Sequence, residues 1–300
     1  MSGGGDVAEL ERLSAEARRS LEAGRLDEAE AQFERLVAAA RGQDDERSAD
    51  RAYCYLAAIG IELGRGEQYV SELRQILMRS ADDESCYRAA YNIARAYELK
   101  KENKKAAFYA RIAHDRAEQV GRREWLASAK NLRANLLVTD SFFAEARGVY
   151  EEALHLAPEL SPVWRALIQD NLGYCYAVEE RYADSFRLLY RSLRSLRRHG
   201  AKRYEVFPLL SLCYAHLEVG RLRSAVKFGL AALQGGEAVG DVQTIKYALF
   251  LLGEAANLAG DHLLARRYFA RLQEEHYPDA AYLPDFLLAI DVRKMINLRA

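Results

Sequence analysis

Apolar residues along this chain follow the spacing of amphipathic helices, and no stretch alternates between apolar and polar residues long enough to predict a strand. Four segments share one arrangement, in which a helical pattern ends at a glycine and a second one begins: LEAGRLDEA, IELGRGEQY, LEVGRLRSA and NLAGDHLLA. The first proline is Pro158, and the sequence before it is rich in residues that favour helices. The pattern therefore predicts an all-α chain built from helical hairpins.

The glycines of these four segments define a repeat of about 40 residues. Gly24 and Gly64 lie 40 residues apart, as do Gly220 and Gly260, and the gap of 156 residues between the two pairs equals four periods of 39. This arithmetic predicts three further copies. They are YNIARAYELKKENKKAAFYARIA, AKNLRANLLVTDSFFAEARGVYEEALHLAP and NLGYCYAVEERYADSFRLLYRSL.

The seven copies share two columns of small residues. The first column reads Ala17, Ala57, Ala94, Ala134, Gly173, Cys213 and Gly253. The second column, twelve residues later, reads Ala29, Tyr69, Ala106, Ala146, Ser185, Ala225 and Ala265. Small residues at fixed positions are expected where two helices cross closely, so each copy is predicted to be a hairpin. Tyr69 is the exception, and we expect it to splay its hairpin.

These columns and the residues around them resemble the tetratricopeptide repeat. The fourth copy carries the resemblance through Ala134, Phe143, Ala146, Tyr150, Ala153, Leu154 and Pro158. The fifth carries it through Leu172, Gly173, Tyr176, Tyr182 and Leu193, and the first through Ala17, Gly24, Leu26, Ala29 and Phe33. The family's usual period is about 34 residues. The longer period here is similar to that of the helical-repeat regions of bacterial signal-responsive regulators and of scaffold adaptors.

The resemblance implies a right-handed α-solenoid of about seven tetratricopeptide-like hairpins in a single domain over residues 7–279. We expect residues 1–6 to form a flexible tail. Residues 280–300 depart from the repeat, and Pro284 there can begin a helix, because the first turn of a helix does not use the missing N–H. The apolar residues that follow predict a capping helix over 281–298, which would close the open end of the solenoid.

Composition narrows the class of protein. The chain has 300 residues, half of them hydrophobic, and its 43 Lys and Arg against 44 Asp and Glu give a net charge of −1. These values exclude a disordered chain and argue against a nucleic-acid binder. No membrane span and no secretory signal are recognisable, so we expect a cytoplasmic location and no membrane partner. Cys54, Cys86, Cys175 and Cys213 form no C-x-x-C motif, which predicts free thiols.

No motif in the sequence indicates an enzyme. There is no H-E-x-x-H, no P-loop, no G-x-S-x-G and no G-x-G-x-x-G. His114 precedes Asp115 and His262 follows Asp261, but neighbours on a helix point in different directions. We therefore expect no catalytic residues, no metal site and no cofactor.

The resemblance also implies a binding groove, because the first helix of each tetratricopeptide hairpin lines a concave surface. The inward positions in repeats three to seven are Arg88, Tyr91, Arg95, Asn131, Asn135, Asp170, Tyr174, Tyr214, Tyr247, Phe250 and Glu254. Asparagine amides can pair with the backbone of an extended peptide, and two arginines can grip a carboxylate. Aromatic side chains are typical of binding hot spots. We expect the groove to change from polar and cationic in repeats three and four to aromatic in repeats six and seven.

The leading hypothesis is a non-enzymatic scaffold that binds a protein or peptide in this groove. The alternative is a sensory or regulatory module of a bacterial signalling or transcription system, which responds to a peptide or small ligand. RNA binding is disfavoured because the groove residues vary from copy to copy. An arginine stripe in the fifth repeat, with Arg187, Arg191, Arg194 and Arg198, is interpreted as a solvated helix face. The sequence leaves self-association and the identity of the partner open.

Overall fold

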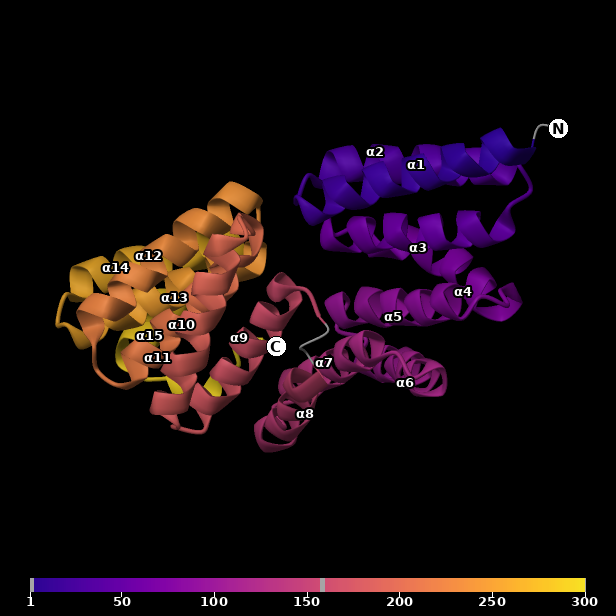
Figure 1. Cartoon of the computed structure of the whole chain (residues 1–300). Coiled ribbons are helices and arrows are strands. Elements are labelled where there is room, and N and C mark those ends of the chain that lie inside the picture. The colour runs from indigo at the N-terminus through magenta and orange to yellow at the C-terminus, as the bar shows by residue number, and fades with distance from the viewer. Residues whose placement is uncertain (1–2, 157–159, 300) are drawn as a thin grey trace. The chain divides into compact units, whose positions relative to one another are not determined.

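A computed structural model of the chain describes residues 3–156 and 160–299, and every regular element in this part is helical (Figure 1). The first helices are α1 (Gly3–Glu22), α2 (Leu26–Gly42), α3 (Glu46–Glu62), η1 (Gly66–Tyr69), α4 (Val70–Arg79), α5 (Asp83–Leu99), α6 (Asn103–Val120) and α7 (Arg123–Thr139). The others are α8 (Phe143–Leu156), α9 (Pro162–Val178), α10 (Tyr182–Arg198), η3 (Lys202–Tyr204), α11 (Val206–Glu218), α12 (Leu222–Val239), α13 (Val242–Leu258), α14 (His262–His276), α15 (Leu283–Ala289) and η4 (Arg293–Met295). The expected all-α helical-repeat solenoid is confirmed.

The chain divides into two compact units, unit 1 (Met1–Leu136) and unit 2 (Leu137–Ala300), and α7 runs across the boundary. Within unit 1, α1 packs on α2, α2 on α3, α4 on α5, and α5 on α6. Within unit 2, each helix from α8 to α14 packs on the next, and α15 packs on α14. The first helices of the last three hairpins, α9, α11 and α13, also contact one another in sequence order. These three helices form the surface on which the candidate site is built.

Every hairpin turns with the same backbone geometry. The second residue after the first helix has a positive φ in all seven turns: Gly24, Gly64, Lys101, Ser141, Glu180, Gly220 and Gly260. The next amide then bonds back to a carbonyl five residues earlier, as from Arg25 N to Ser20 O and from Arg181 N to Tyr176 O. This is the usual end of a helix at a left-handed residue. Glycine is the favoured residue there, and the three copies without it were the three less obvious ones in the sequence.

The two columns of small residues lie where the helices of each hairpin cross. Ala17, Ala94 and Ala134 are completely buried, and the second column is equally buried apart from Tyr69. A Cβ added to Gly173 would come within 2.7 Å of Leu189, and one added to Gly253 within 2.2 Å of Phe269. These approaches are too close for any side chain larger than hydrogen. The predicted crossing positions are therefore confirmed.

The second hairpin departs from the others at Tyr69, as the sequence predicts. The tyrosine ring occupies the space above Gly60, where an added Cβ would lie 2.0 Å from the ring. The chain passes through η1 before α4 begins, and the close backbone contacts of α4 are with η1 and α5 rather than with α3. Tyr69 thus splays the hairpin, and Gly60 accommodates its ring.

Both ends of the chain differ from the prediction. Helix α1 already begins at Gly3, so the expected tail over 1–6 is too long, because a helix propagates with one hydrogen bond per added residue even through weak helix formers. The helix expected over 281–298 covers only Leu283–Ala289. Ile290 has an extended backbone, and the β-branched Ile290, Val292 and Ile296 favour the helix less than Leu or Ala do. The capping role of α15 stays a prediction.

Three further expectations can be placed on the structure. All four cysteines are free and buried. No helix in the described part of the chain is both long and apolar enough to cross a membrane. Pro158, which carried part of the resemblance, lies outside the described residues.

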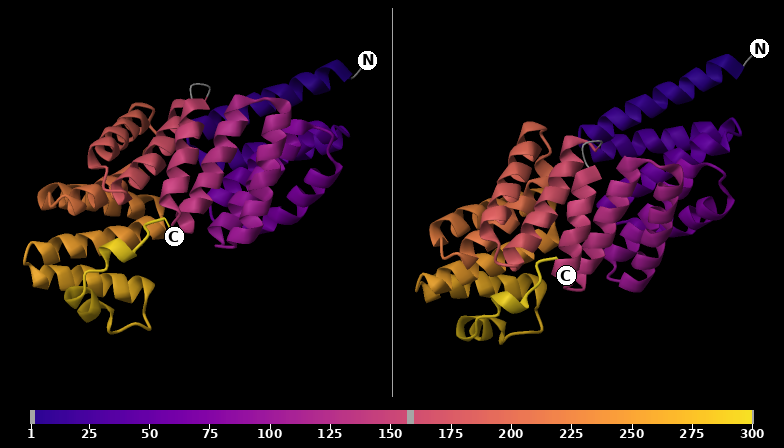
Figure 2. Two further views of the ribbon diagram at one scale, coloured as in Figure 1. Left: turned by 90° about the horizontal axis from the view of Figure 1, so that it is seen from below. Right: turned by 60° about the horizontal axis from the view of Figure 1, so that its bottom comes forward.

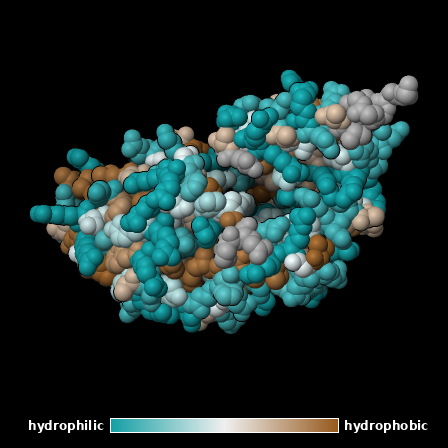
Figure 3. All heavy atoms as spheres, viewed as in Figure 1, coloured by the Kyte–Doolittle hydropathy of each residue, from teal (hydrophilic) through white to brown (hydrophobic). Residues whose placement is uncertain are grey.

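Hydrophilic side chains dominate the face of the molecule in Figure 3, with hydrophobic ones scattered among them.

Candidate peptide-binding site

The last ten described residues, 290–299, leave α15 and lie against the first helices of the preceding hairpins. We call this segment the strap and the surface beneath it the strap site. Figure 2 shows the strap as the yellow trace that runs from α15 toward the earlier helices of unit 2. It contains only the short η4 turn, and its partners lie on α7, α9, α11 and α13 and at the turns beside them. The strap site is therefore occupied by an irregular segment of the same chain.

Arg299 anchors the end of the strap. Its guanidinium donates to Asp170 Oδ2 at 2.7 Å and to Ser211 Oγ at 2.9 Å. The Ser211 hydroxyl in turn donates to Asp170 Oδ1 at 2.8 Å, so both carboxylate oxygens are satisfied. The guanidinium also lies 5.3 Å from the centre of the Tyr174 ring, within the range of a cation–π interaction. Two helices, α9 and α11, thus combine into one arginine pocket.

Tyr174 holds the strap by its backbone. Its hydroxyl accepts a hydrogen bond from Leu298 N at 3.0 Å and lies 3.4 Å from Asn297 Oδ1. The Asn297 amide donates to Val138 O at 2.6 Å, at the end of α7. Leu298 itself is buried. These contacts fix the strap by a mixture of one apolar side chain, one amide side chain and one main-chain group.

Two further cations anchor the middle of the strap. Arg293 lies 3.4 Å from Glu218 at the end of α11 and 3.6 Å from Glu254 on α13. Lys294 pairs with the exposed Glu180 at 2.7 Å. Asp291 pairs with Arg293 from within the strap. The cations of the strap therefore face acidic side chains at both ends of the site.

Because these acidic groups are buried, their charged forms are unfavourable unless a cation lies beside them. Asp170 is 1% exposed and Glu254 is 2% exposed. Burial raises the pKa of Asp170, while Arg299 and Ser211 act to lower it. Burial, followed by the charge of Asp291, raises the pKa of Glu254 from 4.5 to about 7, and Arg293 opposes this shift. A buried carboxylate without a partner is strongly unfavourable, so this surface favours an occupant that carries positive charge.

The six groove residues predicted in unit 2 all lie at or around the strap site. Asp170, Tyr174 and Glu254 contact the strap. The other three are buried beside them on α11 and α13: Tyr214, Tyr247 and Phe250. Tyr214 lies 5.7 Å from Tyr174, ring centre to ring centre. The aromatic character expected for these repeats is present, but the side chains are covered. Their role in binding a partner stays a prediction.

Four of the groove residues predicted in unit 1 contact neighbouring side chains of the same unit. Arg88 donates to Glu84 at 2.9 Å and its guanidinium lies 4.2 Å above the Tyr55 ring. Arg95 pairs with Glu98 at 3.4 Å, and Asn135 hydrogen-bonds the same carboxylate. The remaining two are Tyr91, whose ring stacks on Tyr87, and the buried Asn131. Their charges are balanced on the same surface, and their role in binding also stays a prediction.

Sequence reasoning missed the strap and several residues that contact it. Arg293 and Asn297 lie within the expected capping helix over 281–298, and Arg299 lies just beyond it. Glu218 and Ser211 are not among the predicted groove residues. The available signal was the cluster of cations in DVRKMINLR, together with acidic residues on the first helices of repeats five to seven. No local pattern connects these two features.

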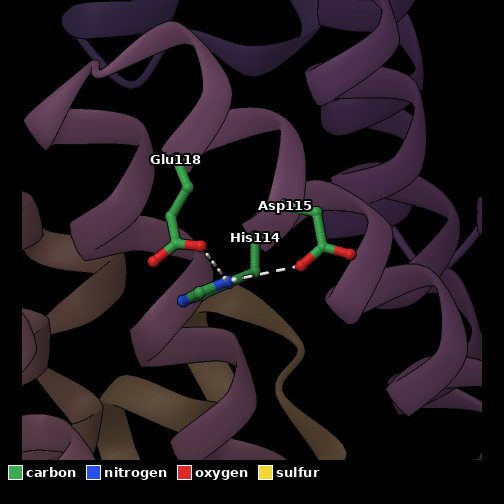
Figure 4. Close-up of side chains that lie close together, drawn as sticks. All are labelled: His114, Asp115 and Glu118. Atoms are coloured by element: carbon green, nitrogen blue, oxygen red, sulfur yellow. Dashed lines mark ion pairs between the residues drawn. The ribbon is translucent and has the colours of Figure 1, made fainter.

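Other charged clusters of the described residues lie outside the strap site. His114, Asp115 and Glu118 lie close together on α6 (Figure 4), and the His114 Nδ1 is 3.7 Å from Asp115 and 4.0 Å from Glu118. All three come from one helix, and both carboxylates are exposed. The arginines of the α10 stripe are exposed, in agreement with a solvated helix face.

An open cleft of about 760 Å³ in unit 1 is also charged, but its charges pair within it. Arg51 donates to both oxygens of Asp82, at 2.6 and 2.8 Å, and Arg79 pairs with Asp50 at 2.7 Å. The cleft is therefore already neutralised by its own side chains.

Known protein structures similar to this chain are helical-repeat proteins. No protein-family model and no curated protein sequence matches it. One is a signal transduction ATPase with numerous domains from Pyrococcus horikoshii, which has a tetratricopeptide repeat sensor. It has a TM-score of 0.63 and 16% identity to this chain, over 91% of this chain and 43% of that one. A Rap protein complexed with competence and sporulation factor has a TM-score of 0.60 and 15% identity, over 96% and 99% of the two chains.

A third structure, the type IV pilus biogenesis factor PilW, has a TM-score of 0.56 and 20% identity over 79% of this chain and 98% of that one. The chain has the tetratricopeptide-repeat fold. When the hairpins are numbered as tetratricopeptide repeats, the strap lies on the first helices of repeats five, six and seven. Identities this low establish the fold, and what each of these proteins binds belongs to that protein.

Proposed function

We propose that the chain is a non-enzymatic binding protein that holds an extended protein or peptide segment on the first helices of its tetratricopeptide repeats. One observation carries the proposal: the strap, an irregular segment, already lies on this surface in unit 2 and is held there by side chains of three helices. A surface that accommodates one such segment has the hydrogen-bonding groups, apolar contacts and charges that another requires.

In unit 2 we assign this binding to Asp170, Tyr174, Tyr214, Tyr247, Phe250 and Glu254. The polar residues of unit 1 are proposed as a second region of contact, comprising Arg88, Tyr91, Arg95, Asn131 and Asn135. Their paired charges suit an occupant without net charge. The cytoplasmic location and the absence of a nucleic-acid partner stay predictions.

Capture from a lysate of the native organism tests this function. The bait variant is Asp170→Asn with Tyr174→Phe, which removes the charge and the hydroxyl that hold the strap. The matched control is Asp184→Asn with Tyr190→Phe on α10, which makes the same chemical changes away from the strap site. We expect partners to be captured by the wild type and the control and lost from the site variant. Equal capture by all three would contradict the assigned site.

A regulatory function is the second candidate. It is supported by the similarity, along nearly the whole of both chains, to a Rap protein complexed with competence and sporulation factor. In this interpretation the bound segment would be a signal that changes the state of the protein. A change in hydrogen exchange in α9–α13 on binding would favour a regulator, whereas unchanged exchange outside the contact residues would favour a passive scaffold.

A further inference from the structure

The acidic side chains of the strap site take their cations from the strap alone. Within the described residues, each ion pair of Asp170, Glu218 or Glu254 has Arg293 or Arg299 as its cation. These pairs join residues far apart in the sequence, with separations of 75 and 129 for Glu218–Arg293 and Asp170–Arg299. These three carboxylates thus receive their positive charge from the strap.

The strap is also separable from the helices that it covers. It follows α15 and makes no helix longer than the three residues of η4. Val292 and Leu298 are buried, whereas Lys294 and Met295 are exposed, Met295 by 81%. Only part of the strap is therefore covered, and its release need not disrupt any helix of the repeat array.

From these observations we propose that the strap is an internal ligand of the strap site, and that the external partner of this site is an extended basic peptide that displaces it. The proposal rests on the function proposed above and specifies the chemistry of the partner. An arginine of the peptide would take the place of Arg299 between Asp170, Ser211 and Tyr174. A neighbouring aliphatic residue would replace Leu298, and a second cation would replace Arg293 beside Glu218 and Glu254.

The size and chemistry of the pocket support arginine rather than lysine at the Arg299 position. One guanidinium nitrogen, Nη2, donates to both Asp170 and Ser211, and the guanidinium carbon lies 5.3 Å from the centre of the Tyr174 ring. A planar guanidinium can make all three interactions at once, whereas an ammonium is a compact point charge. We therefore expect a peptide with lysine at this position to bind at least threefold more weakly than the same peptide with arginine.

The test is a competition between the strap and a free peptide of the same sequence. A fluorescein-labelled peptide with the sequence of residues 290–299 is titrated, by fluorescence anisotropy, with the full chain and with a chain that ends at Ala289. We expect the shortened chain to bind at least tenfold more tightly, because its site is unoccupied. Asp170→Asn in the shortened chain should weaken binding at least tenfold. Asp115→Asn, the same change on an exposed position of α6, is the matched control and should leave binding unchanged.

A second variant keeps the test decisive if the shortened chain does not fold by circular dichroism. Lys294→Glu in the full chain places a negative charge beside the exposed Glu180, which loosens the strap without leaving a buried charge unpaired. It should bind the labelled peptide more tightly than the unchanged chain does. In both forms of the test, a peptide with glutamate at the position of Arg299 should not bind.

Three results would overturn the proposal. The first is that the full chain, the shortened chain and Lys294→Glu bind the labelled peptide equally well, while Asp170→Asn still weakens binding. This result would show that the strap does not compete with the peptide, and it would leave the proposed function intact. Failure of every form to bind the basic peptide, while lysate partners are still captured, would reject the chemistry of the partner alone. A dimer that disappears when the strap is removed, measured by light scattering, would show that the strap fills the site of a second copy instead.

Discussion

The first helices of the repeats carry charged residues in both units, but the charges are balanced in different ways. In unit 1, Arg88 pairs with Glu84 and Arg95 pairs with Glu98, three or four residues apart on the same helix. In unit 2, Asp170 and Glu254 pair with arginines of the strap. The first helices of the repeats thus form a surface whose charges neutralise one another in unit 1. In unit 2 they form an acidic site whose cations come from a segment distant in the sequence.

This difference shows why the repeat pattern alone does not define a ligand. The local pairs on one helix have carboxylates that stay 14% and 16% exposed, so these pairs are partly solvated and constrain an occupant weakly. Buried carboxylates whose cations come from another segment make the surface dependent on that segment. The surface of unit 2 is therefore the more selective of the two for a positively charged occupant. Variants that change the charges, the packing and the turns of the two units test this difference.

The largest effect is expected from Arg299→Ala compared with Arg88→Ala. Removal of Arg299 leaves the buried carboxylate of Asp170 without a cation, and we expect the free energy of unfolding to fall by roughly 3 kcal/mol. Removal of Arg88 breaks an ion pair within one helix whose carboxylate, that of Glu84, is 14% exposed, and should cost less, roughly 1 kcal/mol. Urea denaturation followed by circular dichroism measures both. Equal losses would contradict the comparison, and Asp170→Asn added to Arg299→Ala should recover part of the first loss.

The crossing positions should respond alike in both units, because they have the same packing role. Ala134→Leu in unit 1 and Gly173→Leu in unit 2 place a bulky side chain where two helices meet, which we expect to cost roughly 1–3 kcal/mol each. Gly148 on α8 is the control, because an added Cβ there meets no atom within 4 Å. Gly148→Ala should instead stabilise the chain by roughly 0.5–1 kcal/mol. Thermal melts unchanged by either leucine variant would show that the assigned crossing positions are wrong.

The pH dependence of stability should distinguish unit 2 through Glu254. Its pKa is raised from 4.5 to about 7 in the folded chain, so the folded state holds a proton that the unfolded state has lost between these values. The free energy of unfolding therefore falls as the pH rises from about 4.5 to 7, at no more than about 1.4 kcal/mol per pH unit. Glu254→Gln removes this ionisation, and its denaturation profile should fall less steeply over that range. Parallel profiles for the two proteins would contradict the assignment.

The smallest effect is expected at the turns, where the same backbone geometry is made by different residues. Lys101 in unit 1 has a φ of 59°, a conformation that costs little only for glycine. Lys101→Gly should stabilise the chain by up to about 1 kcal/mol, because relief of this strain exceeds the entropy that glycine adds to the unfolded state. Gly64→Ala, at the equivalent turn of the preceding repeat, should destabilise it by a similar amount. Differential scanning calorimetry of both variants tests the pair, and changes of the same sign would contradict it.

Much of the fold could be predicted from the sequence because its determinants recur. Ala17, Ala57, Ala94 and Ala134 are small for the same packing reason, and the repeat places them at nearly equal intervals. The left-handed glycines mark four of the seven turns in the same way. Even the exception at Tyr69 could be anticipated, since one large residue in a column of small ones has a direct steric consequence.

The candidate site could be predicted only in part. The positions of Asp170, Tyr174 and Glu254 on one face followed from the family resemblance, because that face is set by helix geometry. What covers them did not follow. Residues 283–298 contain an apolar pattern that suits a helix, and the lower helix propensity of Ile290, Val292 and Ile296 is too weak a signal to place the end of the helix at Ala289.

The all-α repeat, the place where each hairpin begins and the crossing positions all followed from the sequence. Each of them depends on residues that lie within about 40 positions of one another and recur along the chain. The path of the strap became visible only in the folded structure. Arg299 meets Asp170 across 129 residues, and Asn297 meets Val138 across 159. Such contacts form only when the stacked helices have already brought their partners together, so no periodicity in the chain records them.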